Sequence, residues 1–153
     1  MPIAQLNISV WKIDDASDAA SPFMDNVARM NALAERSDGF VWRLLDEGRD
    51  ENGYTVLGGP ETILTLSVWQ SAKHLEAFAF STVHRKIYER KAEWFAKLKS
   101  HHLVMWNVEN GHLPSLDEAR TRLDHLNEHG NTDFAFDWAH LPEVNLWREK
   151  RVS

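Results

Sequence analysis

Two segments of the chain, 3–12 and 62–69, alternate between side chains of different polarity, and this alternation restricts the fold more than any other feature. Successive side chains of a β-strand point to opposite faces, so a period of two predicts half-buried strands. The first segment has an apolar face of Ala4, Leu6, Ile8 and Val10 and a more polar face of Gln5, Asn7, Ser9 and Trp11. In the second segment, Thr65, Ser67 and Trp69 share one face. Both segments are therefore predicted to be strands that each present hydrogen-bonding groups and a tryptophan.

Between these strands the apolar residues recur at helical spacing. Ser21 and Pro22 predict a helix start, because serine caps free N–H groups and proline fits the first helical position. The spacing continues to about Arg36, and 37–39 ends the helix. A second strand is expected from Phe40 to Leu45, followed by a polar loop over 46–60.

The second half of the chain predicts three more helices and a strand. Ser71 caps a short helix, and a longer helix follows a break at 81–82 and runs to about Leu98. A strand is expected over 102–108. Ser115 and Glu118 form a capping box for a last helix that ends at 130, and 134–138 could form a short final strand.

The order β-α-β-β-α-α-β-α-(β) predicts an α+β fold of the ferredoxin-like, split βαβ type with a four-stranded antiparallel sheet. Residues 1–138 are expected to form one domain that includes the last helix, and 139–153 a tail. With helices on one face, the other apolar face is predicted to be bare. The simplest way to bury this bare face is a homodimer in which the sheets of two copies pack against each other.

Composition excludes several classes of function. The 153 residues contain no cysteine, which removes disulfides, thiolate metal sites and cysteine nucleophiles. The net charge of -6 argues against nucleic-acid and membrane partners, and no metal site is predicted. The N-terminus does not look like a secretory signal, so a cytoplasmic location is expected. Seven tryptophans suggest an aromatic-lined cavity or a large interface.

The polar faces of the two strands are the candidate binding site. Buried hydrogen-bonding groups are costly unless they are paired, so either they pair with one another or with a partner copy, or they floor a pocket for a small hydrophobic or aromatic molecule. His84 lies on the apolar stripe of the long helix, where burial favours the neutral imidazole that a general base requires. The predicted catalytic residues are His84, Asn7 and Trp69. The predicted substrate-binding residues are Trp42, Ser67, Gln5, Tyr88, Trp106 and Arg85.

Several stretches resemble one bacterial family, the domain of unknown function 3291. They include AQLN at 4–7, MNALAERSDGFVWRL at 30–44, SVW at 67–69, FAFSTVHR at 78–85 and GHLPSLDEARTRL at 111–123. The resemblance implies the dimeric α+β barrel fold and supplies no reaction.

A more distant resemblance, to antibiotic-biosynthesis and heme-degrading monooxygenases, implies a chemistry. The heme-degrading enzymes use an asparagine on the first strand, a tryptophan on the third strand and a histidine on the second helix. Asn7, Trp69 and His84 fall in those places, although the gap between the last two is longer here.

Three functions remain open from the sequence. The first is a cofactor-independent oxygenase for an aromatic or polyketide-like molecule, in which His84 is the base, Asn7 stabilises an oxyanion and Trp69 stacks on the substrate. An isomerase or cyclase would use the same groups. The second is heme binding, with His84 as axial ligand and Arg85 near the propionates. The third is a non-catalytic ligand-binding dimer.

Overall fold

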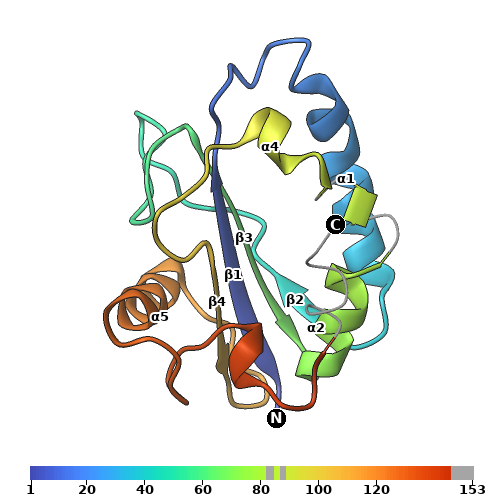
Figure 1. The fold of residues 1–153 in the computed structure, drawn as a ribbon, viewed down its shortest axis with the longest axis vertical. Coiled ribbons are helices and arrows are strands. Elements are labelled where there is room, and N and C mark those ends of the chain that lie inside the picture. Colours follow the sequence, from blue (N-terminus) through green and yellow to red (C-terminus); the bar gives the residue numbers. More distant parts are fainter. Residues whose placement is uncertain (82–84, 87–88, 146–153) are drawn as a thin grey trace.

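A four-stranded antiparallel sheet forms the centre of the computed structural model, which describes residues 1–81, 85–86 and 89–145 (Figure 1). The strand order is β2-β3-β1-β4. The bounds are β1 Ile3–Val10, β2 Phe40–Arg43, β3 Thr62–Trp69 and β4 Leu103–Asn107. This arrangement, with its helices, is the α+β ferredoxin-like fold that the sequence predicts.

The helices begin where the sequence predicts, but only two of these three starts have a side-chain cap. Helix α1 spans Ser21–Arg36 with a proline in its first turn, and the prediction that Ser21 caps it is wrong: the N-cap is Ala20, and the Ser21 hydroxyl donates to Asp25 instead. Helix α2, Ala72–Ala79, begins after Ser71, whose side chain accepts a hydrogen bond from the backbone N–H of His74. Helix α5, Leu116–His129, begins after Ser115 in the same way. Each cap satisfies a backbone donor that the first helical turn leaves free. No helix in the described ranges is long and apolar enough to cross a membrane.

The long helix predicted to reach Leu98 is wrong at its C-terminal end. Helix α4 covers only Lys91–Trp94. Phe95 then pairs with Trp11 as an isolated antiparallel bridge, and the N–H of Ala96 donates to the carbonyl of Val10 at 2.8 Å. Phe95 fits the helical spacing of apolar residues, but its half-buried side chain packs beside Trp11 at this bridge.

The apolar face of the sheet is covered by α5, which corrects the prediction of a bare face. Figure 1 shows α5 on one side of the sheet and α1 and α2 on the other. The core on the α5 side contains Ala4, Leu6, Leu64, Leu66, Val68, Val104 and Trp106 from the strands and Ala119, Leu123 and Leu126 from the helix. The premise for sheet-against-sheet packing is therefore absent, and the homodimer stays a prediction.

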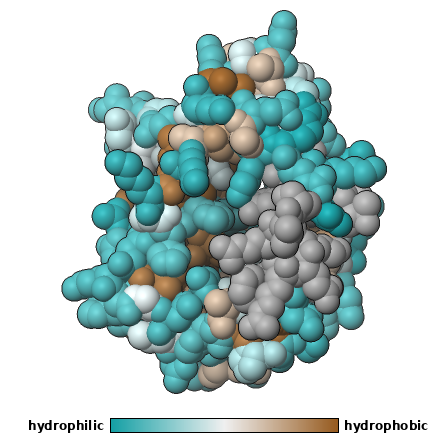
Figure 2. All heavy atoms as spheres, in the orientation of Figure 1, coloured by the Kyte–Doolittle hydropathy of each residue, from teal (hydrophilic) through white to brown (hydrophobic). Residues whose placement is uncertain are grey.

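The loop between β2 and β3 contributes to this internal cover. Leu57 packs against the same core, and the Arg120 guanidinium of α5 donates to the carbonyl of Val56. The face seen in Figure 2 is mostly hydrophilic, with apolar residues in small separate patches.

The segment after α5 returns to the sheet and then docks on α2. Phe136 exchanges two backbone hydrogen bonds with Met105 of β4, so the predicted last strand is a single bridge. A 3₁₀ turn, Trp138–His140, follows. Val144 is buried, and the N–H of Asn145 donates to the buried carboxylate of Glu76 at 2.8 Å. The start of the predicted tail is thus part of the packed structure.

Candidate functional site

Five neutral polar side chains lie together on the face of β1 and β3 that α1 and α2 cover. Asn7 is the register partner of Thr65, Gln5 is the partner of Ser67, and Ser9 continues the row along β1. We call these five residues the polar strip. The alternation in the sequence predicted this grouping, because residues two apart on a strand share a face.

One half of the polar strip satisfies its own hydrogen bonds. The Gln5 amide nitrogen donates to the Ser67 hydroxyl oxygen at 2.8 Å and to that of Thr65 at 3.3 Å. The indole N–H of Trp69 donates to the same Ser67 oxygen at 3.0 Å. Gln5 and Ser67 are each only 7% exposed. In this half, the polar groups pair with one another, which is one of the two alternatives that the sequence left open.

The other half of the polar strip is open. Thr65 is exposed although it lies on a central strand, and Asn7 and Ser9 are half-buried. Among the described residues, none forms a hydrogen bond with the Asn7 side chain. A side chain in the middle of a helix-covered sheet face is normally buried, so its exposure indicates space above the sheet at this point.

Aromatic side chains close both ends of the polar strip. Trp69, 1% exposed, stacks on Phe78 of α2 with ring centroids 5.2 Å apart and meets the edge of Phe40. At the opposite end, Trp11 contacts Phe23 of α1 and Phe95, with centroids 5.4 and 4.6 Å away. The open centre therefore lies between two apolar clusters, an arrangement typical of sites for small apolar molecules with a polar group.

One ion pair of the described residues lies beside the polar strip. Arg43 of β2 is the register partner of Ser67, and its Nε lies 3.6 Å from the carboxylate of Glu35 on α1. None of the five strip residues is itself charged. The site can therefore offer hydrogen bonds to a ligand without offering a net charge.

Two predicted substrate-binding tryptophans are separated from the polar strip by the sheet. Trp42 and Trp106 belong to the core on the α5 side, and the indole N–H of Trp106 donates to Glu118 of α5 at 2.8 Å. The structure thus corrects their grouping with Asn7, because neighbouring strand positions point to opposite faces.

Two of the three predicted site residues between positions 80 and 90 lie outside the residues that the structure describes. His84 and Tyr88 are outside the described residues. Arg85 is half-buried and pairs with Glu89 at 2.9 Å. The sequence places Thr65 on the candidate polar face but not among the predicted substrate-binding residues. Its face was evident from the alternation, whereas its exposure depends on packing by distant segments.

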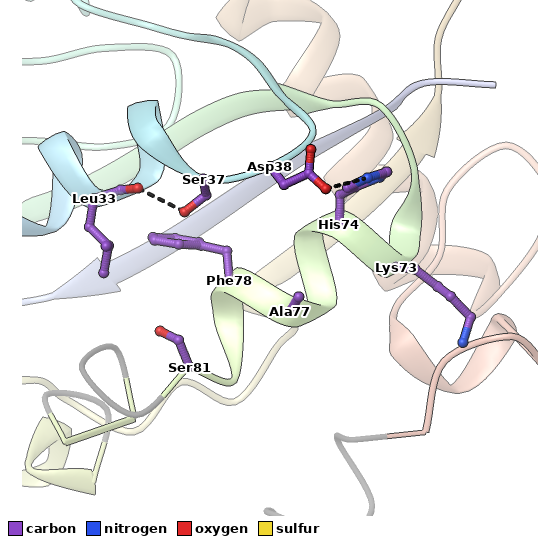
Figure 3. A pocket seen from close by; sticks show the side chains of 8 residues that line it. All are labelled: Leu33, Ser37, Asp38, Lys73, His74, Ala77, Phe78 and Ser81. Carbon is purple, nitrogen blue, oxygen red and sulfur yellow. Dashed lines mark hydrogen bonds and ion pairs between the residues drawn. The ribbon is translucent and has the colours of Figure 1, made fainter.

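A hollow of about 320 Å³ lies between α1 and α2 but does not include the polar strip (Figure 3). Phe78 and Leu33 form part of its wall, and Lys73 extends away from them. Two of its polar groups are already paired: Ser37 donates to the carbonyl of Leu33, and His74 lies between Ser71 and Asp38. We therefore place the candidate site on the polar strip.

Histidine and carboxylate groups form no evident metal site in the described part of the chain, where no set of three His, Asp or Glu side chains could hold an ion. The rings of His125 and His129 are tilted against each other with centroids 4.5 Å apart, and the His125 ring nitrogen lies 3.0 Å from the Thr132 hydroxyl.

The fold is shared with several solved structures of low sequence identity. A conserved protein from Methanosarcina mazei has a TM-score of 0.54 at 13% identity, covering 71% of this chain and 94% of that one. Rv0793 from Mycobacterium tuberculosis has a TM-score of 0.52 at 13% identity, covering 73% and 100%. A variant of SnoaB, a cofactor-independent oxygenase from Streptomyces nogalater, has a TM-score of 0.50 at 15% identity, covering 74% and 98%. At these identities the likeness concerns the fold alone.

Sequence comparison assigns the family. No curated protein matches the chain. One family model matches residues 2–152, which is almost the whole sequence. The chain therefore belongs to the family described as domain of unknown function DUF3291.

Proposed function

We propose that this protein binds a small, neutral aromatic molecule over the open half of the polar strip and oxygenates it without a resident cofactor. The observation that carries the proposal is the unpaired Asn7 amide beside the exposed hydroxyl of Thr65, at the centre of a sheet face that helices otherwise cover. Asn7 is half-buried beside the exposed Thr65, so water can pair with its amide in the free protein, and a ligand oxygen can take the place of that water.

The aromatic clusters at both ends support an aromatic ligand. Trp69 with Phe78 and Trp11 with Phe95 limit the polar strip along the strands, so a flat apolar molecule would lie between them with its oxygen on Asn7 and Thr65. Trp69 is fully packed, so we assign it to the wall of the site rather than to direct stacking on the ligand.

The fold likeness to the SnoaB oxygenase supports the reaction class. In the proposed reaction, a ring CH₂ that is acidic through conjugation with a carbonyl across the ring loses a proton to His84, and Asn7 donates a hydrogen bond to the enolate oxygen that forms. The electron-rich anion reduces dioxygen, and loss of water leaves a second carbonyl. The balance is one CH₂ and one O₂ giving one C=O and one H₂O.

An oxygen-electrode assay with dithranol, a hydroxylated anthrone, tests this proposal. We expect oxygen uptake above the rate of autoxidation, with stoichiometric formation of the anthraquinone. Asn7→Ala is expected to lower the turnover number by about 10²–10³-fold, as for loss of an oxyanion donor, and Asn52→Ala in the exposed loop serves as the matched control.

The base is tested in the same assay. His84→Ala is expected to reduce the rate strongly, whereas His129→Ala, on the exposed face of α5, should leave it unchanged. Turnover without oxygen uptake would assign an isomerase or cyclase instead. A Soret band on adding hemin that His84→Ala abolishes would assign heme binding, and neither result is compatible with the proposed oxygenase.

A further inference from the structure

We propose that the polar strip selects its ligand through an oxygen atom that accepts two hydrogen bonds, one from Thr65 and one from Asn7, and that Gln5 is the positioning residue that directs the Thr65 hydroxyl. This inference rests on the proposed binding site and names the ligand class: neutral molecules with a carbonyl, in preference to molecules of the same shape that carry an N–H donor.

Ser67 fixes which groups donate and which accept along the polar strip. Its oxygen accepts from the Trp69 indole, which has a donor and no acceptor, and also from the Gln5 amide nitrogen. A hydroxyl oxygen has two lone pairs, so these two bonds use its full capacity as an acceptor. Trp69 and Gln5 are both buried, and their positions relative to Ser67 are fixed by the β1–β3 register.

Gln5 also determines how the Thr65 hydroxyl is oriented. The same amide nitrogen donates to the Thr65 hydroxyl oxygen at 3.3 Å, so Thr65 is an acceptor on the side that faces Gln5. Its own O–H hydrogen must then point elsewhere. Because Thr65 is exposed, that hydrogen is available to a ligand in the space above the sheet.

Asn7 provides a second donor at the same point. It lies directly opposite Thr65 across the β1–β3 pair, where side chains on one face are neighbours. Its amide has two N–H donors, and within the described residues it forms no hydrogen bond. A single acceptor oxygen placed between the two strands can meet both residues.

Charge restricts the ligand class further. A buried carboxylate requires a cation or several donors, and the cation beside Ser67, Arg43, is already paired with Glu35. A carbonyl requires only the two donors. We therefore infer that the site favours a neutral ketone over a carboxylate of similar size.

Three tricyclic molecules of nearly the same shape test the inference by equilibrium dialysis. Fluorenone presents a carbonyl acceptor, carbazole presents an N–H donor, and fluorene presents neither. In the unmodified protein we expect each of the two neutral hydrogen bonds to favour fluorenone over fluorene by about two- to tenfold in affinity, and carbazole to gain nothing over fluorene.

Substitutions then locate the preference. Thr65→Val keeps the shape and removes the hydroxyl, so it should lower the fluorenone-to-fluorene affinity ratio while leaving fluorene affinity unchanged. Thr65→Ser should restore the ratio. Thr121→Val makes the same chemical change on the exposed surface of α5 and serves as the matched control.

The positioning role of Gln5 has its own readout. Gln5→Met has a similar length and no donor, so it should lower the affinity ratio without touching the ligand, and the thermal midpoint of each variant confirms folding. A ratio unchanged in both Thr65→Val and Gln5→Met, or a preference for carbazole, overturns the inference alone. Failure of all three molecules to bind overturns the proposed binding site together with it.

Discussion

Trp69 shows how one side chain can satisfy a functional pattern and still be part of the core. The sequence predicts Trp69 as a catalytic residue, yet its ring is packed between Phe40 and Phe78 and its N–H donates to Ser67. Burial on this scale makes stability the main contribution of the residue.

Substitution of Trp69 should therefore act on stability before it acts on binding. We expect Trp69→Phe to lower the free energy of unfolding by about 1–3 kcal/mol, from one lost hydrogen bond and a small cavity, and Trp69→Ala by about 3–5 kcal/mol. Urea unfolding measures both. Loss of fluorenone binding in Trp69→Phe with unchanged stability would instead show that the indole contacts the ligand.

His102, which precedes β4, should make stability depend on pH. Partial loss of water contact is the main cause that lowers the pKa of His102 below its usual value of about 6.5, and the charges of Lys91 and His101 lower it further. The folded state therefore favours the neutral ring. This contribution is complete above the unfolded pKa and is lost as the pH falls through the lower folded pKa.

The expected effect of His102 is modest, because much of the residue remains in contact with water. We expect the urea midpoint to fall less between pH about 7.5 and about 5 in His102→Gln than in the unmodified protein. His129→Gln, on the exposed end of α5, is the control. Equal falls in all three proteins would contradict the assigned pKa direction.

At the scale of elements, the cap of α5 controls a helix that covers half of the core. Ser115 accepts the N–H of Glu118 at 3.1 Å, and the Glu118 side chain holds the indole of Trp106. We expect Ser115→Ala to cost about 0.5–2 kcal/mol of unfolding free energy. Hydrogen exchange should accelerate in α5 and not in α2, and Ser100→Ala, an exposed serine outside the helices, should change neither.

Local sequence signals were sufficient to predict the bounds of helices and strands that depend on neighbouring residues alone. The serine–proline start predicted α1 over Ser21–Arg36, and alternation predicted β3 over Thr62–Trp69, both with the observed bounds. The helix predicted to Leu98 ends early because Phe95 forms a backbone bridge to Trp11, a contact between distant segments that periodicity does not contain.

The same distinction applies to the candidate site. Alternation identified the residues that share the face of Asn7, and the register confirms that grouping. It did not show that Gln5 and Ser67 pair internally while Thr65 stays open, since both depend on where α1, α2 and the aromatic clusters pack. Which side of the sheet Trp106 joins depended on α5, whose docking face the sequence left undetermined.

At the scale of the whole molecule, the sheet separates two different environments. One face is an apolar core closed by α5, and the other carries the partly open polar strip under α1 and α2. Because α5 occupies the apolar face, the protein can keep that face out of water without a second copy. The polar face is then the side of the sheet on which Asn7 and Thr65 can still form hydrogen bonds with a ligand.

Undocking α5 should convert this internal cover into self-association. Leu126 is 1% exposed in the core between α5 and the sheet, so Leu126→Glu places an unpaired carboxylate there and favours release of the helix. The strand residues beneath it then form a large exposed apolar patch, which generally drives association. We expect light scattering coupled to size exclusion to show a higher mass for Leu126→Glu, and binding of the dye ANS to increase. Leu113→Glu, at an exposed leucine before α5, should leave both unchanged. An unchanged mass and dye signal in Leu126→Glu would mean that α5 is not what keeps the apolar face from a second copy.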